Sequence, residues 1–97
     1  KVMVIEMNLI EASRAGNLNK VKELIAAGID VNVRWVGEWT PLHEACWRDN
    51  TEVAKVLVSA GADINARTFN GSTPLHFAII NDYTKIAEYL KQNGAVE

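Results

Sequence analysis

His43 and Cys46 are the two residues whose types and spacing suggest chemistry in this sequence. They lie three positions apart, so a helix would place them on one face, where an imidazole activates a thiol or both side chains bind a metal ion. No third ligand or orienting carboxylate is apparent, and the sequence has no phosphate loop, nucleophile elbow or metal motif. We therefore interpret Cys46 as a small core residue. We predict a protein that is not an enzyme, with no cofactor and no metal.

Length and composition set the class of protein. The chain has 97 residues, which is the size of one domain, and its formal net charge of −2 argues against general binding to nucleic acid or to an anionic membrane. No apolar stretch approaches the length of a membrane span. The run from Lys1 to Ile5 is interrupted by Glu6 and has no cleavage site, so we do not interpret it as a signal peptide. A single cysteine favours a reducing compartment, and we expect a cytoplasmic location.

An internal repeat carries most of the structural information. The segment Thr40-Pro41-Leu42-His43 recurs as Thr73-Pro74-Leu75-His76, a shift of 33 residues. The same shift relates further sets: Ala12, Ala45 and Ala78; Leu24, Leu57 and Leu90; Gly28, Gly61 and Gly94; Asp30 and Asp63; Asn32 and Asn65. A period of this length indicates a stacked solenoid, in which each unit buries one face against its neighbour.

The repeated unit predicts two helices and a projecting loop. Thr40 suits a helix N-cap, and the proline that follows it is tolerated in the first turn. A second helix is expected over residues 51–60, and Gly61 ends it with a left-handed C-cap. The segment Asn70-Gly71 predicts a tight turn at the tip of the second loop. In the first loop, Gly37-Glu38 stands in the same place, which leaves its tip geometry open.

Thr-Pro-Leu-His-x-Ala with a 33-residue period resembles the ankyrin repeat, over residues 8–97. The resemblance implies an all-α repeat solenoid of helix-turn-helix units with projecting β-hairpin loops. It also implies that the rings of His43 and His76 hydrogen-bond within the repeat and brace the turn. Helices in adjacent repeats lie roughly 8–10 Å apart, so the two imidazoles are poorly placed to share one metal ion.

Departures from the pattern suggest capping units. We divide the chain into an N-terminal extension (1–7), an N-terminal cap (8–33), a central repeat (34–66) and a C-terminal cap (67–97). Lys20 and Glu23 make the first unit polar, while Phe77 and Ile79 supply bulk at the other end. This favours a self-contained domain that is a monomer when unbound. The alternative is a structural spacer or a piece of a longer array, which packs end to end near Phe77, Ile79 and Tyr89.

The resemblance implies that partners bind at the hairpin tips and on the exposed, concave side of the inner helices. All three tryptophans and all four arginines fall there, whereas the lysines fall on the outer helices and the N-terminal extension. Tryptophan and arginine are enriched at binding hot spots, and lysine is depleted at interfaces. The candidate partner-binding residues are Trp39, Trp47, Arg48, Phe69, Arg67, Arg14, Trp35, Ile80, Asn81 and Arg34.

These residues predict a non-catalytic protein–protein interaction module. Within the first hairpin, either Trp35 or Val36 is expected to brace the loop, because alternate side chains point to opposite faces. Rings surrounded by arginines suit a partner with an apolar anchor flanked by acidic groups. Such a surface fits a natural domain and an engineered ankyrin-type binder equally, and the sequence does not identify the partner.

Overall fold

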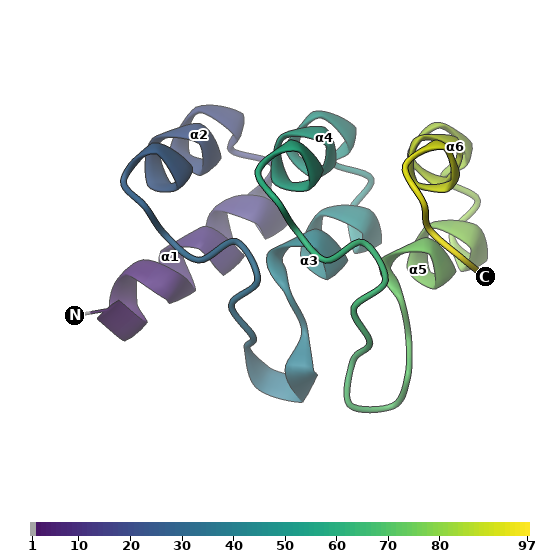
Figure 1. The fold of residues 1–97 in the computed structure, drawn as a ribbon, viewed down its shortest axis with the longest axis horizontal. Helices are drawn as coiled ribbons and strands as arrows, with labels where there is room; N and C mark the ends of the chain where they lie inside the picture. The colour runs from purple at the N-terminus through teal and green to yellow at the C-terminus, as the bar shows by residue number, and fades with distance from the viewer. Residues whose placement is uncertain (1) are drawn as a thin grey trace.

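The computed structural model describes the backbone of residues 2–97 and the side chains of residues 8–97. Over residues 2–97, six α-helices form three stacked pairs, and one short 3₁₀ turn, η1, lies between the first and second pairs (Figure 1). The helices are α1 (Val2–Ala15), α2 (Leu18–Ala26), α3 (Pro41–Trp47), α4 (Thr51–Ser59), α5 (Pro74–Ile80) and α6 (Thr84–Gln92), and η1 is Val36–Glu38. The predicted all-α repeat fold is therefore confirmed.

Two layers of helices run along the molecule. The inner helices α1, α3 and α5 pack in sequence against one another, and the outer helices α2, α4 and α6 form a second layer above them (Figure 1). Two loops project from the inner layer, one before α3 and one before α5. None of the helices in the described part of the chain has the length and hydrophobicity needed to cross a membrane.

Local sequence signals set the helix boundaries as predicted. The Thr40 side chain accepts a hydrogen bond from the His43 N–H, and the Thr73 side chain accepts one from the His76 N–H. Both residues precede a proline in the first turn, where no N–H is needed. Gly61 follows α4 with a φ of +102°, a left-handed conformation that glycine adopts without strain.

The core lies between the two layers and runs through all three pairs. Leu42 and Leu75 from the inner helices and Leu57 and Leu90 from the outer helices are fully buried. Small alanines at the periodic positions let successive helices approach closely, and Ala45 and Ala78 are also fully buried. Each pair thus completes the core of its neighbour, as a solenoid requires.

The two projecting loops share one geometry. In the first, the Trp35 N–H donates to the Trp39 carbonyl and the Glu38 N–H donates to the Trp35 carbonyl. In the second, the Thr68 N–H donates to the Ser72 carbonyl and the Gly71 N–H donates to the Thr68 carbonyl. Neither loop forms a β-strand within residues 2–97, so the expected β-hairpins are hairpin-like turns.

The sequence left the backbone geometry at the tip of the first loop open. In the structure, this geometry matches that of the second loop. Glu38 adopts a φ of +64° where Gly71 has +85°. The equivalent hydrogen bond is kept at both tips, so Glu38 tolerates a conformation that normally favours glycine.

The two ends of the chain depart from the expected pattern in different ways. The backbone of residues 2–7, predicted as an extension, is the first part of helix α1, and the side chains of residues 1–7 lie outside the described residues. The Tyr89 hydroxyl lies 3.5 Å from the Lys55 carbonyl on α4, so Tyr89 points toward the middle pair. Its expected place on the free end was wrong.

Candidate protein-binding surface

Three aromatic side chains meet on the inner layer. The Phe77 ring from α5 lies 4.7 Å from the Trp39 ring and 5.2 Å from the Trp47 ring, and the two tryptophans are 6.0 Å apart, between centroids. Trp47 meets both neighbours edge to face, an arrangement that stabilises aromatic pairs. We call Trp39, Trp47 and Phe77 the aromatic cluster. It joins the first loop, α3 and α5.

Phe77 does not lie where the sequence pattern predicts. It was expected to fill the free end of the C-terminal unit, but it is only 6% exposed and packs back against the middle unit. The period offered a signal, because Glu11 and Glu44 occupy the equivalent positions in the first and second units. Glu44 is itself only 6% exposed and bonds Arg14 of the first unit, so the side chain at this position reaches back to the preceding unit, as Phe77 does.

The loop tips carry the most exposed apolar side chains. Val36 is 74% exposed and Phe69 is 84% exposed, and they are equivalent residues of successive loops. The Phe69 N–H donates to the Gly37 carbonyl at 2.8 Å, so the two tips are joined through their main chains. Trp35 is half-buried and is therefore the bracing member of its pair. Val36 was missed as a candidate contact residue.

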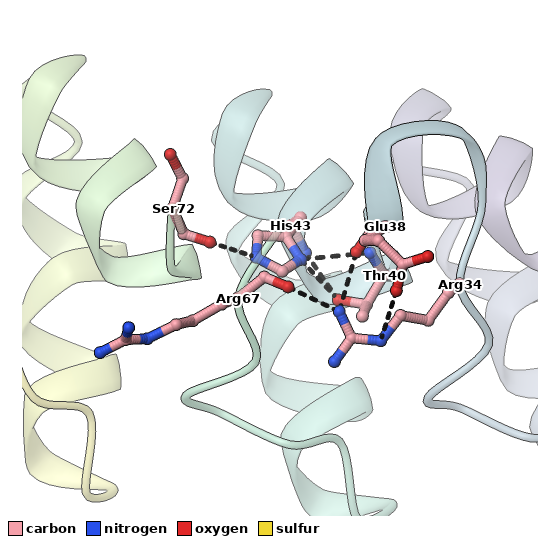
Figure 2. Close-up of polar contacts among 6 residues, drawn as sticks. All are labelled: Arg34, Glu38, Thr40, His43, Arg67 and Ser72. Atoms are coloured by element: carbon pink, nitrogen blue, oxygen red, sulfur yellow. Dashed lines mark hydrogen bonds and ion pairs between the residues drawn. The ribbon is translucent and has the colours of Figure 1, made fainter. Parts of the chain in front are cut away.

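The four arginines separate into two groups. Arg14 pairs with Glu44 on α3, at 3.1 Å from Nε and 3.4 Å from Nη2, and this hydrogen bond raises the pKa of the guanidinium. Arg34 donates to the Glu38 carbonyl at 3.0 Å and to the Arg67 carbonyl, which ties the first loop to the second (Figure 2). Arg48 and Arg67 are exposed. Only the second pair is therefore placed for a partner.

The remaining candidates lie at the end of α5. Ile80 is 55% exposed and is equivalent to Trp47, whereas Asn81 is half-buried and its amide donates to the Phe77 carbonyl at 2.9 Å. The outer layer is different in character. Lys20 and Lys55 pair there with glutamates on their own helices. Tryptophan and arginine on the inner layer thus stand apart from lysine on the outer layer.

His43 braces the middle unit as expected. Its Nδ1 accepts a hydrogen bond from the Thr40 N–H at 3.1 Å, so Nε2 carries the proton and donates to the Ser72 carbonyl at 3.0 Å (Figure 2). The residue is fully buried, and burial is the main cause that lowers its pKa. With both nitrogens bonded to main chain, the ring is held neutral and unavailable to a thiol.

His76 does not repeat this role, contrary to expectation. His76 is exposed, and only its main-chain N–H takes part in the helix cap, where it donates to the Thr73 hydroxyl. The physical reason lies outside the motif: the acceptor for the His43 ring comes from the loop that follows its own unit. The Thr-Pro-Leu-His segment places the ring, but a neighbouring unit must supply the partner.

Cys46, on α3, is part of the hydrophobic core. Its side chain is fully buried, and burial raises the pKa of the thiol well above its usual range. A protonated, enclosed thiol is a poor nucleophile. Among the residues that the structure describes, no group of three or more His, Cys, Asp or Glu is arranged to hold a metal ion.

Comparison with known proteins agrees with the repeat geometry. The family model described as "Ankyrin repeats (3 copies)" matches residues 9–96, which is nearly the whole chain. A comparison of this chain with curated proteins found no match.

Proposed function

Because this chain belongs to the ankyrin repeat family, whose repeats generally serve as protein–protein interaction modules, we propose that it binds a protein partner without catalysis. The contact surface comprises the loop tips and the open, concave side of the inner helices. The observation that carries this proposal is the exposure of the large apolar side chains Trp47, Ile80 and Phe69 on the inner helices and the loop tip. Exposed patches of this kind on a monomer mark interaction sites.

Trp47 has the properties of a binding anchor. The residue is 39% exposed, yet its ring is held edge-on by Trp39 and Phe77. A large apolar side chain that is already fixed loses little conformational entropy when a partner covers it. Anchors of this type dominate the binding energy of protein interfaces.

The proposed contact surface is charged in the first unit and apolar in the second and third units. The equivalent inner-helix positions are Arg14, Trp47 and Ile80, one in each unit. Arg14 is occupied by Glu44, so the apolar contact area belongs to the second and third units. Arg48 and Arg67 are available beside it to pair carboxylates, and Asp49 tempers their charge. These contacts favour a partner with an apolar anchor and flanking acidic groups.

Trp47→Ala should weaken binding by at least about 2 kcal/mol, because it removes the centre of the apolar contact area. The variant should keep its helical circular dichroism, since Trp47 is not part of the enclosed core. Wild type, Trp47→Ala and Lys55→Ala are used as matched baits, with bound proteins quantified by mass spectrometry. The affinity of any captured protein is then measured by titration calorimetry.

Lys55→Ala is the control, because Lys55 lies on the outer helix α4. A genuine partner of the inner surface is lost with Trp47→Ala and retained with Lys55→Ala. Equal loss with both variants would place the partner on the outer layer and overturn the assignment of the surface.

Cys46 should resist thiol reagents in the native protein and react fully in urea, because its side chain is fully enclosed. The rate of labelling, followed by mass spectrometry, measures this directly. Rapid labelling without denaturant would revive an enzymatic role.

We also propose a cytoplasmic location, because this free thiol forms no disulfide and suits a reducing compartment.

A further inference from the structure

Two asparagines in this chain directly precede a glycine. Asn70-Gly71 lies at the tip of the second projecting loop, before α5 (Figure 1), and Asn93-Gly94 follows the end of α6. Asparagine is a thermolabile residue, because the main-chain nitrogen of the next residue attacks its side-chain amide carbon. Glycine favours this attack, since it has no Cβ to hinder the approach. The sequence therefore holds two candidate sites for one reaction, and the structure distinguishes them.

The reaction at the loop tip joins the Gly71 nitrogen to the Cγ of Asn70. The nitrogen gives its proton to hydroxide, and the side-chain amide takes a proton from water and leaves as ammonia. The product is a cyclic succinimide. Water then opens the ring at either carbonyl and leaves aspartate, or isoaspartate in which the main chain runs through the side-chain carbonyl. The net change consumes one water and releases one ammonia, and nothing is oxidised or reduced.

Two hydroxyl groups are directed at the carbonyl oxygen of the Asn70 side chain. The Thr68 hydroxyl donates to Oδ1 at 2.7 Å, and the Ser72 hydroxyl donates to the same atom at 3.3 Å. Attack on Cγ turns this oxygen into an oxyanion, and donors already aimed at an oxygen stabilise the charge that develops there. Thr68 is buried, and its hydroxyl accepts from the Ser72 N–H at 3.0 Å, so the donor is held in place.

The reacting groups at the loop tip are open to water. Asn70 and Gly71 are both exposed, so hydroxide reaches the attacking nitrogen and ammonia leaves freely. Among the described residues, the hydrogen bonds to the Asn70 side chain go to its oxygen and leave Nδ2, the departing nitrogen, untethered. One contact opposes the attack, because the Gly71 N–H donates to the Thr68 carbonyl at 2.9 Å. A single main-chain hydrogen bond on an exposed loop opens at low cost.

Asn93 is held in the opposite way. Its side-chain nitrogen donates to the Tyr89 carbonyl at 2.8 Å, and its main-chain N–H donates to the Leu90 carbonyl at 3.1 Å. Cyclisation at Asn93 must therefore break the contact of the departing nitrogen and disturb the end of α6. In the described part of the chain, no hydroxyl donates to the Asn93 side-chain oxygen.

We propose that Asn70 is a site of spontaneous deamidation in the folded protein, and that the Thr68 and Ser72 hydroxyls accelerate the reaction by stabilising its oxyanion. The product adds a negative charge at the loop tip of a chain whose formal net charge is already −2. Isoaspartate also lengthens the main chain between Thr68 and Ser72, so the hydrogen bonds across the tip lose their geometry. Phe69, whose N–H joins the two loop tips, is the preceding residue. A consequence for partner binding rests on the proposed function, whereas the reaction itself does not.

The test compares the two asparagines within one protein. The intact chain is aged in mildly alkaline buffer at physiological temperature, and is then digested with trypsin in mild acid. Cleavage after Arg67, Lys85 and Lys91 places Asn70 and Asn93 in separate peptides, 68–85 and 92–97, whose conversion is quantified by mass spectrometry with fragmentation. Asn70 should convert faster than Asn93 by about tenfold or more in the folded protein. In guanidinium chloride the two rates should be about the same, because both are then unfolded Asn-Gly segments.

Matched variants test the role of the hydroxyls. Thr68→Val removes the donor and keeps a branched side chain of similar shape, whereas Thr68→Ser keeps the hydroxyl. Thr68→Val should slow the conversion of Asn70, and Ser72→Ala should slow it less, because its hydrogen bond is longer. Thr68→Ser should retain most of the rate, and the rate at Asn93 should stay unchanged in all three variants.

A purely structural role for Thr68 predicts the reverse, because a loosened tip would let Asn70 cyclise faster in Thr68→Val. A rate in Thr68→Val that is unchanged or higher would therefore overturn the proposal. Equal conversion of Asn70 and Asn93 in the folded protein would also overturn it. Asn70→Asp provides the reference for the aspartate product, and an isoaspartyl methyltransferase detects the isoaspartate product.

Discussion

Leu57→Ala should lower the free energy of unfolding by about 2–5 kcal/mol, the range for removing a leucine from an enclosed core site. Leu57 is fully buried on α4, the outer helix that packs against α2, α3 and α6. The substitution therefore opens a cavity in the core of the middle unit, whose outer helix contacts both neighbouring units. Urea denaturation measured by circular dichroism gives the change.

This loss is large for a small domain, whose total stability is typically about 5–15 kcal/mol. Lys55→Ala is the matched control, because Lys55 lies two residues away on the same helix with an exposed side chain. It should change the stability by less than about 0.5 kcal/mol. If Leu57→Ala has an unfolding midpoint within error of the wild type, the core has been placed on the wrong residues.

Much of the fold was predictable because each unit repeats the same local instructions. Thr40 and Thr73 cap their helices through contacts with residues three positions away, and Gly61 ends α4 with its own backbone conformation. Such short-range signals need no knowledge of the rest of the chain. The 33-residue period then assigned the stacking order, because a unit of that length has one face to bury on each side.

The sequence could not show which neighbour a long side chain reaches. The period placed Arg14 and Arg34 on the side expected to bind a partner. In the structure, Arg14 bonds the Glu44 carboxylate, and Arg34 donates to two main-chain carbonyls. Phe77 likewise has a position fixed by the period and a direction fixed by the aromatic rings of the middle unit. Apart from the Arg34–Glu38 hydrogen bond within the first loop, these contacts cross between units, so they depend on packing and not on spacing.

His43 and His76 show, within a single motif, that contacts between units depend on packing. Both follow Thr-Pro-Leu, and both receive the threonine cap on their N–H. Only His43 meets the following loop, and only His43 is buried. The difference makes the two histidines a matched pair for measuring what the buried ring contributes.

His43→Ala should lower the free energy of unfolding by about 2–5 kcal/mol. The ring bridges the Thr40 N–H and the Ser72 carbonyl in an enclosed site, so its removal leaves two polar groups without partners and a cavity between loops. His76→Ala, at the exposed equivalent, should change the stability by less than about 0.5 kcal/mol. Equal effects for the two variants would mean that the bridge contributes nothing.

The same ring should make stability depend on pH in one direction. Burial lowers the pKa of His43, so the unfolded chain, with an ordinary histidine pKa near 6.5, takes up the proton first as the pH falls. The unfolded state then binds more protons than the folded state, and stability decreases between about pH 6.5 and the lowered pKa of the folded protein. Above that window the contribution is fully present. Denaturation in urea at pH 7.5 and pH 5.0 should show this loss in the wild type and in His76→Gln, and a smaller loss in His43→Gln, whose amide does not titrate. If the pH dependence of His43→Gln matches that of the wild type, the buried ring is not the group that titrates.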